Sequence, residues 1–88
     1  MAQLEVCVDT YQGACSASAG GAARIELCSS LSEGGLTPSA GLMQAAARLK
    51  TPCFAMIRPR SDLFGFSEAD VRVMLADIRS ARDAGLAG

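Results

Sequence analysis

The feature that most constrains this chain is the regular alternation of strand-like and helix-like segments along it. The strand-like segments are residues 4–9, 24–28 and 53–58, and residues 86–88 look like the approach to a fourth strand. In the first two segments apolar and polar side chains alternate, which is typical of half-buried strands. Because parallel neighbouring strands need a crossover connection, strands that alternate with helices predict successive βα units and a parallel sheet.

Two of the helix-like segments carry clear start signals. We predict that one helix begins with Thr37 as its N-cap and Pro38 in its first position. The last helix is predicted to begin at Ser67, which forms an approximate capping box with Asp70 three residues later. We expect this last helix to bury an apolar stripe formed by Val71, Met74, Leu75, Ile78 and Ala81.

The face of the predicted strands that points away from the helices is unusually polar. It carries Glu5, Asp9, Arg24, Glu26 and Arg58. A second helical layer would not cover such a face, whereas the lumen of a closed barrel accommodates paired charges and builds sites from them. We therefore predict an α/β fold of the (βα)8 TIM-barrel family, here only the first three βα units and the approach to the fourth strand.

Chain length sets the expected domain organisation. A closed (βα)8 barrel takes about 250 residues, and this chain has 88. We expect residues 1–88 to be the N-terminal part of a single, truncated barrel domain. If the 88 residues fold as they stand, the sheet has two open edges, which association into a homo-oligomer would cover.

Composition and charge exclude several classes of function. Half of the residues are hydrophobic, 19% are charged and the net charge is −1. Nucleic-acid-binding domains normally carry a basic excess, so we expect no nucleic-acid partner. No apolar run approaches the roughly 20 residues that span a bilayer, and the first residues lack the features of a signal peptide. We expect a cytoplasmic protein with no membrane partner, whose four cysteines stay reduced.

Four sequence motifs stand in order along nearly the whole chain. They are Leu4-Glu5-Val6-Cys7-Val8-Asp9, Arg24-Ile25-Glu26-Leu27-Cys28, Ser32-Glu33-Gly34-Gly35-Leu36-Thr37-Pro38-Ser39 and Met56-Ile57-Arg58-Pro59-Arg60. Together they resemble the CutC family of copper homeostasis proteins. The resemblance implies a cytoplasmic TIM barrel associated with copper handling, which binds Cu(I) through cysteine. By match of motif, the copper-binding residues fall on Cys7 and Cys28.

The residues themselves allow two interpretations of these cysteines. Cys7 and Cys28 share the polar-face parity of neighbouring strands and lie near the carboxyl ends, where barrel sites form. Thiolate and thioether ligands select Cu(I), and Met56 has the same parity if Arg58 points inward. The other interpretation is that both cysteines are small buried hydrophobic side chains.

Charged residues on the same face suggest an alternative class of function. Glu5 and Glu26 could act as acid and base, or could be neutralised by arginines in an ion network. Arg58 and Arg60 leave the end of the third strand and suit a phosphate or carboxylate, or else fix the loop through salt bridges. The alternative is therefore a TIM-barrel enzyme acting on a small anionic metabolite, with Glu26, Arg58 and Glu5 as catalytic candidates.

Overall fold

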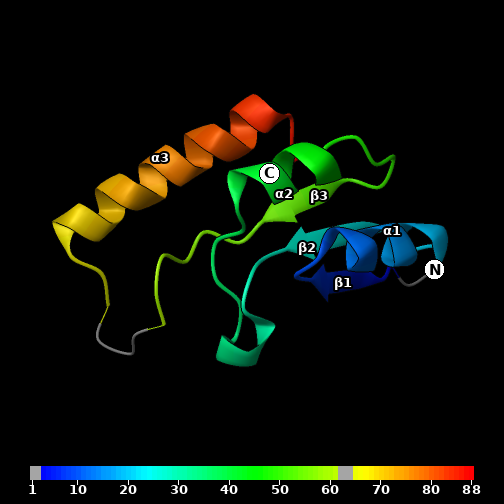
Figure 1. Cartoon of the computed structure of the whole chain (residues 1–88), viewed down its shortest axis with the longest axis horizontal. Helices are drawn as coiled ribbons and strands as arrows, with labels where there is room; N and C mark the ends of the chain where they lie inside the picture. The colour runs from blue at the N-terminus through cyan, green and yellow to red at the C-terminus, as the bar shows by residue number, and fades with distance from the viewer. Residues whose placement is uncertain (1–2, 62–64) are drawn as a thin grey trace.

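The computed structural model describes residues 3–61 and 65–88 and shows an α/β arrangement (Figure 1). The elements in chain order are β1 (Glu5–Val8), α1 (Tyr11–Ala19), β2 (Arg24–Leu27), the 3₁₀ turn η1 (Leu31–Glu33), α2 (Ala40–Ala46), β3 (Cys53–Ala55) and α3 (Glu68–Ala84). The strands form one parallel sheet in the order β1-β2-β3. The predicted βα repeat is thus confirmed, with strands shorter than expected.

The register of the sheet places apolar side chains of all three strands on one face. Val6 lies beside Ile25 and Ile25 beside Cys53, while Val8 lies beside Leu27. Neighbours at one level of a parallel sheet point to the same side, so these side chains form a continuous layer. Ile25 and Leu27 are both 0% exposed. Burial of each contributes about 1.5–3 kcal/mol to the free energy of unfolding.

Helices α1 and α2 cover this apolar face (Figure 1). Right-handed crossovers between strands in sequential order place successive helices on the same side of a sheet. Ala14 of α1 and Ala46 of α2 are buried in the core cluster with the strand residues. Their small side chains let both helices approach the sheet closely, so the apolar side chains on this face are buried.

The opposite face of the sheet carries the polar residues and is open. Cys7, Glu26 and Phe54 form one row across the three strands. At the preceding level Glu5 lies beside Arg24, and their side chains form an ion pair of 2.6 Å. The Arg24 guanidinium also lies over the Phe54 ring, 5.7 Å from its centre. The alternation predicted from the sequence therefore sorts the side chains correctly between the two faces.

The start of α2 differs from the prediction. Ser39 is the N-cap, because its hydroxyl accepts a hydrogen bond of 3.1 Å from the Leu42 amide, and the helix begins at Ala40. The predicted cap, Thr37, uses its hydroxyl to accept a 2.8 Å hydrogen bond from the Arg58 amide. Thr37 was wrongly predicted as a cap because its hydroxyl is occupied by a residue 21 positions away.

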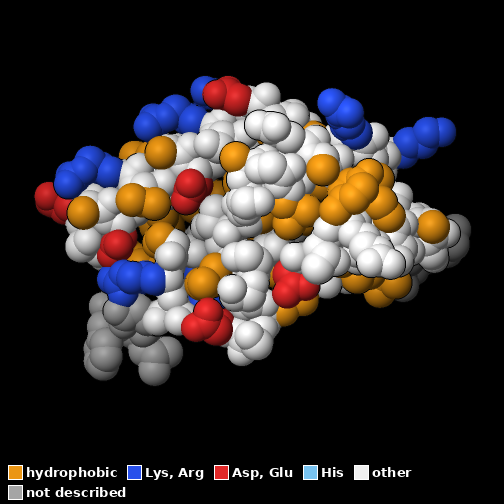
Figure 2. Space-filling model, in the orientation of Figure 1, with side chains coloured by type: hydrophobic (Ala, Val, Ile, Leu, Met, Phe, Trp, Pro, Cys, Tyr) orange, Lys and Arg blue, Asp and Glu red, His pale blue; other side chains and the backbone are white. Residues whose placement is uncertain are grey.

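Helix α3 begins as predicted but buries less than predicted. Ser67 and Asp70 form the full capping box, and Gly85 ends the helix in a left-handed conformation. The expected apolar stripe is mostly exposed: Val71 is 46% and Ile78 48% accessible, and only Ala81 is buried. The N-terminal half of α3 projects beyond the sheet in Figure 1, and hydrophobic side chains reach the surface there in Figure 2. The exposed part of the stripe lacks a covering layer among the described residues.

The last two residues, Ala87 and Gly88, continue the sheet. The Ala87 amide donates to the Cys53 carbonyl at 3.0 Å, and the Ala55 amide donates to the Gly88 carbonyl at 2.9 Å. These bonds pair the chain end with the edge of β3 that β2 does not occupy, in the position of a further parallel strand. The predicted approach to a fourth strand is therefore present. In the described part of the chain, no helix has both the length and the apolar character needed to cross a membrane.

Urea denaturation at several pH values tests the contribution of Asp70 to the capping box. Hydrogen bonds from the Arg60 side chain and the Ser67 amide lower the pKa of Asp70 from 3.8 to about 2. A depressed folded-state pKa stabilises the fold above pH 3.8, and this contribution is lost as the pH falls through about 2. We expect Asp70→Asn to be less stable than the wild type in urea denaturation at near-neutral pH, with the difference vanishing in strong acid.

The matched control for this prediction is Asp77→Asn, on the same helix but outside the capping box. A stability difference for Asp70→Asn that stayed constant from neutral pH to strong acid would contradict the role given to the carboxylate.

Candidate functional site

The candidate site lies where the carboxyl ends of β1 and β2 meet the loop of residues 29–37. Parallel strands bring their carboxyl ends to one edge of a sheet, and sites of α/β proteins form there. Asp9 follows β1 directly and Cys28 follows β2 directly. Asp9 accepts a hydrogen bond of 3.3 Å from the Leu31 amide, which ties the end of β1 to the loop after β2.

Cys28 is held as a buried, neutral thiol. It is 1% exposed, and its amide donates to the Val8 carbonyl at 3.0 Å. Its thiol donates to the same carbonyl at 3.4 Å. Burial raises the pKa of Cys28 above 9.0, and the negative charge of Asp9 raises it further. The fold therefore fixes the position of this sulfur while disfavouring a bare thiolate.

Cys7 is the opposite case, because it lies exposed on the open face of the sheet. Its thiol donates to a Glu26 carboxylate oxygen at 3.5 Å. Desolvation raises the pKa of Cys7 above 9.0, and the charge of Glu26 adds to this shift. Cys7 is therefore accessible but is also mainly protonated near neutral pH.

The structure brings the two cysteines to one side of the sheet. Cys7 lies beside Glu26 in the register, and Cys28 stands two residues beyond Glu26 along the same chain. Negative charge on Cys7 raises the pKa of Cys28, which places the two thiols within electrostatic reach. Among residues 3–61 and 65–88, no cluster of three or more His, Cys, Asp or Glu side chains is arranged to hold a metal ion.

These donors suit a soft monovalent cation better than a hard divalent one. Two thiols with carboxylates nearby offer sulfur ligands and negative charge, and Cu(I) prefers sulfur. The carboxylates of Asp9 and Glu26 disfavour bare thiolates, but the same charges attract a cation that compensates them. The residues present therefore fit Cu(I). Cys7 and Cys28 remain predicted ligands.

The loop of residues 29–37 forms an ordered cover over Cys28. Ser29 and Leu36 exchange two backbone hydrogen bonds of 2.8 Å, which close the loop at its base. Gly35 has a φ of +94°, a backbone conformation that residues with a side chain rarely adopt. A Cβ atom at Gly35 would lie 3.4 Å from the Cys28 sulfur and 3.4 Å from the Met56 methyl group. The Gly35 backbone therefore covers both sulfur-bearing side chains.

Arg58 fixes this cover in place. One nitrogen of its guanidinium donates to the carbonyls of Glu33 and Gly35, at 2.9 and 3.0 Å. The Thr37 amide donates to the Arg58 carbonyl at 3.0 Å, so the backbone of residue 58 is also bound to the loop. Hydrogen bonds that involve a charged group contribute about 1.5–3 kcal/mol each. Loop fixing was one of the two roles expected of Arg58, but its partners here are backbone carbonyls and not the carboxylate of a salt bridge.

Arg58 and Arg60, predicted to bind an anion together, bind two different segments of the chain. Arg60 donates to Asp70 at 2.7 Å and to the Gly65 carbonyl at 2.9 Å. It also lies over the Phe66 ring, 5.5 Å from its centre. Arg60 thus anchors the start of α3, whereas Arg58 anchors the loop over Cys28. The contacts described here give both arginines a structural role, and anion binding by this pair remains a prediction.

The two candidate acid–base residues also have different surroundings. Glu5 forms the ion pair with Arg24, as the neutralised alternative predicted. Glu26 accepts a hydrogen bond from the Cys7 thiol. Glu26 is therefore in direct contact with one of the two candidate copper ligands, Cys7. A catalytic role for either carboxylate remains a prediction.

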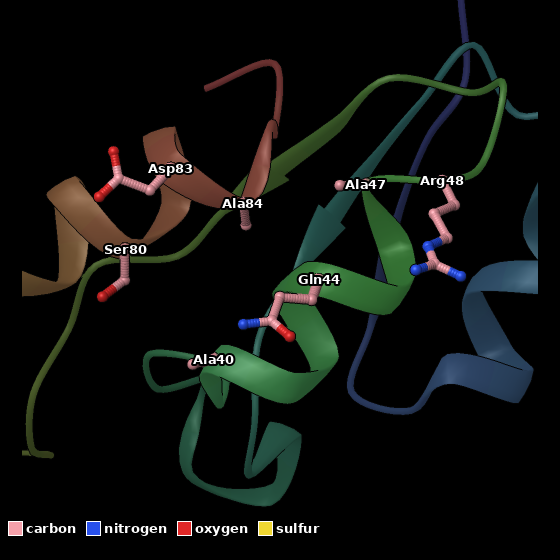
Figure 3. A pocket seen from close by; sticks show the side chains of 7 residues that line it. All are labelled: Ala40, Gln44, Ala47, Arg48, Ser80, Asp83 and Ala84. Atoms are coloured by element: carbon pink, nitrogen blue, oxygen red, sulfur yellow. The ribbon is translucent and has the colours of Figure 1, made fainter.

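A separate groove of about 500 Å³ lies between α2 and α3, and neither Cys7 nor Cys28 lines it (Figure 3). Gln44 and Arg48 contribute to it from α2 and the turn that follows, and Ser80 and Asp83 from α3. None of the site residues predicted from the sequence lines this groove.

Cysteine labelling tests the link between Cys7 and Glu26. Because the Glu26 carboxylate raises the pKa of Cys7, Glu26→Gln should lower that pKa and increase the thiolate fraction. We expect iodoacetamide to label Cys7 about two- to fivefold faster in this variant than in the wild type, at a fixed pH below 9.0. Mass spectrometry of the Cys7 peptide measures the labelling rate. Glu68→Gln on α3 is the control, and equal rates in all three proteins would contradict the link.

Comparison with known proteins agrees with these observations. The model of the CutC family matches residues 2–88. A CutC family protein of Photobacterium profundum is 59% identical over 87 residues, which cover 98% of this chain and 36% of that protein. One of Rhizobium meliloti is 60% identical over 85 residues, which cover 97% of this chain and 35% of that protein. The chain therefore spans about a third of the length of these relatives.

A solved structure shows the same fold. The crystal structure of a Streptococcus agalactiae CutC, to which copper homeostasis has been ascribed, superposes with a TM-score of 0.87 at 30% identity. The match covers 96% of this chain and 42% of that one. The three βα units described above are accordingly those of the TIM-barrel family, as the sequence predicted. This chain belongs to the CutC family.

Proposed function

We propose that this chain is the N-terminal part of a single copper-homeostasis barrel and that it binds Cu(I) through the thiolates of Cys7 and Cys28. The observation that carries the proposal is the position of the two thiols, on one side of the sheet at neighbouring strands. The ascribed role of the Streptococcus agalactiae CutC in copper homeostasis supports it.

Coordination would require each thiol to lose its proton. Both cysteines have a pKa above 9.0 in the metal-free protein, so a metal ion must compete with protons for each sulfur. The affinity for Cu(I) should therefore rise with pH across the neutral range. Two thiolates would already neutralise the single positive charge of Cu(I), so the occupied site would carry a net negative charge beside Asp9 and Glu26.

The alternative function, binding of a small anionic metabolite, has less support from the geometry. Arg58 and Arg60 hold different segments of the chain and are both bound to protein oxygens. The carboxylates of Asp9 and Glu26 also give the edge of the sheet a negative character, which repels anions. Copper binding is the function that these contacts favour.

We further propose a reducing, cytoplasmic location. All four cysteines are free thiols in the described structure, and free thiols persist where the compartment keeps them reduced. Copper enters such a compartment as Cu(I), the state that thiolates bind.

An anaerobic competition titration tests the proposal. We expect the wild-type chain to take up Cu(I) in a one-to-one complex, and Cys7→Ser/Cys28→Ser to lose this affinity by at least about a hundredfold, because hydroxyl oxygen is a poor ligand for a soft ion. The matched control is Cys15→Ser, which removes a partly exposed thiol from α1.

Circular dichroism should first show that all three proteins are folded. Affinity that is equal in the wild type and the double variant would overturn the proposal. Loss of affinity in Cys15→Ser alone would move the site to α1.

A further inference from the structure

We propose that Met56 supplies a third sulfur donor, a thioether, to the Cu(I) bound by Cys7 and Cys28, and that Gly35 keeps the space between Cys28 and Met56 clear. This inference rests on the proposed function and deepens it, because it names a specificity-determining residue for the same site.

The backbone fixes Met56 beside the end of β2. The Met56 amide donates to the Leu27 carbonyl at 2.8 Å, so Met56 stands directly beside the level of Cys28. Phe54 lies beside Glu26 on the open face, and Met56 is two residues beyond Phe54. Residues two apart in an extended chain point to the same side, so Met56 shares the side of Cys7 and Cys28.

Cys28 and Met56 border a common space under Gly35. A Cβ atom at residue 35 would lie 3.4 Å from the Cys28 sulfur and 3.4 Å from the Met56 methyl carbon. The absence of a side chain at Gly35 therefore leaves room between two sulfur-bearing side chains. Arg58 holds the Gly35 carbonyl at 3.0 Å, which keeps this cover in position.

The chemistry of methionine suits this position. A thioether is a soft donor that favours Cu(I), and it carries no charge and no proton to displace. A third thiolate, by contrast, would add negative charge beside Asp9 and Glu26, which already raise the pKa values of the cysteines. Methionine has three rotatable side-chain bonds, so rotation about one of the two bonds before the sulfur would bring the sulfur, in place of the methyl group, into the space under Gly35.

Copper X-ray absorption spectroscopy on the full chain loaded with Cu(I) tests the inference. We expect Met56→Leu, which keeps the side-chain size, to show one sulfur neighbour fewer per copper than the wild type. Its Cu(I) affinity should fall by about tenfold or more, because even the loss of an outer-shell partner costs 10–100-fold. Met74→Leu on α3 is the control and should match the wild type.

A second pair of variants tests the space under Gly35. Gly35→Ala would place a methyl group against both sulfur-bearing side chains and should weaken Cu(I) binding. Gly21→Ala is its control, because Gly21 has a similar φ of +92° with no atom within 4 Å of an added Cβ. The control imposes the same backbone strain without filling the site.

The outcomes separate this inference from the proposed function. If Cys7→Ser/Cys28→Ser loses copper while Met56→Leu keeps both the affinity and the sulfur count of the wild type, the thioether ligand is wrong and the thiolate site stands. If the double cysteine variant keeps its copper, the proposed function fails first. A lower sulfur count in Met56→Leu together with weaker binding supports the third donor.

Discussion

The side-by-side register of the three parallel strands is the constraint on which the rest of the structure depends. Because Val6, Ile25 and Cys53 stand at one level, their side chains form a single apolar surface that α1 and α2 can cover. The same register forces Cys7 and Glu26 to the other side. A shift of one residue in any strand would exchange the two sets and expose the core. The candidate site is thus a direct consequence of strand pairing.

Loop contacts then convert one edge of the sheet into a defined environment. Arg58 binds two carbonyl groups of the loop that follows β2, and Gly35 lies against the Cys28 sulfur. One thiol is consequently buried under a fixed cover, while Cys7 stays exposed beside Glu26. This asymmetry suits a site that admits a metal ion from one side and shields it on the other.

Much of the fold could be predicted from the sequence because it follows from local rules. Alternation along residues 4–9 and 24–28 correctly assigned the two faces of the sheet, and Ser67 with Asp70 correctly located the start of α3. The N-cap of α2 was wrongly predicted, since the Thr37 hydroxyl is taken by a distant residue, Arg58. The apolar stripe of α3 was wrongly predicted as buried, because burial depends on a neighbouring layer that no local pattern specifies.

The candidate site was less predictable than the fold. Strand parity identified Cys7 and Cys28 as neighbours on one side, but the difference in their burial comes from the loop of residues 29–37. The contact of Gly35 with Cys28 and Met56 depends on backbone hydrogen bonds across the loop base. The pair of adjacent glycines was the only local sign of it, and a glycine pair alone does not say what it covers.

The most direct measurement of the central claim is to locate the metal. Crystals of the chain grown anaerobically with Cu(I) would be measured at the copper absorption edge, and an anomalous difference map would be calculated. We predict one strong peak between the sulfur atoms of Cys7 and Cys28, under the loop that carries Gly35. A peak elsewhere, such as at Cys15 on α1, or a copper-saturated protein with no peak at these two sulfur atoms, would contradict it.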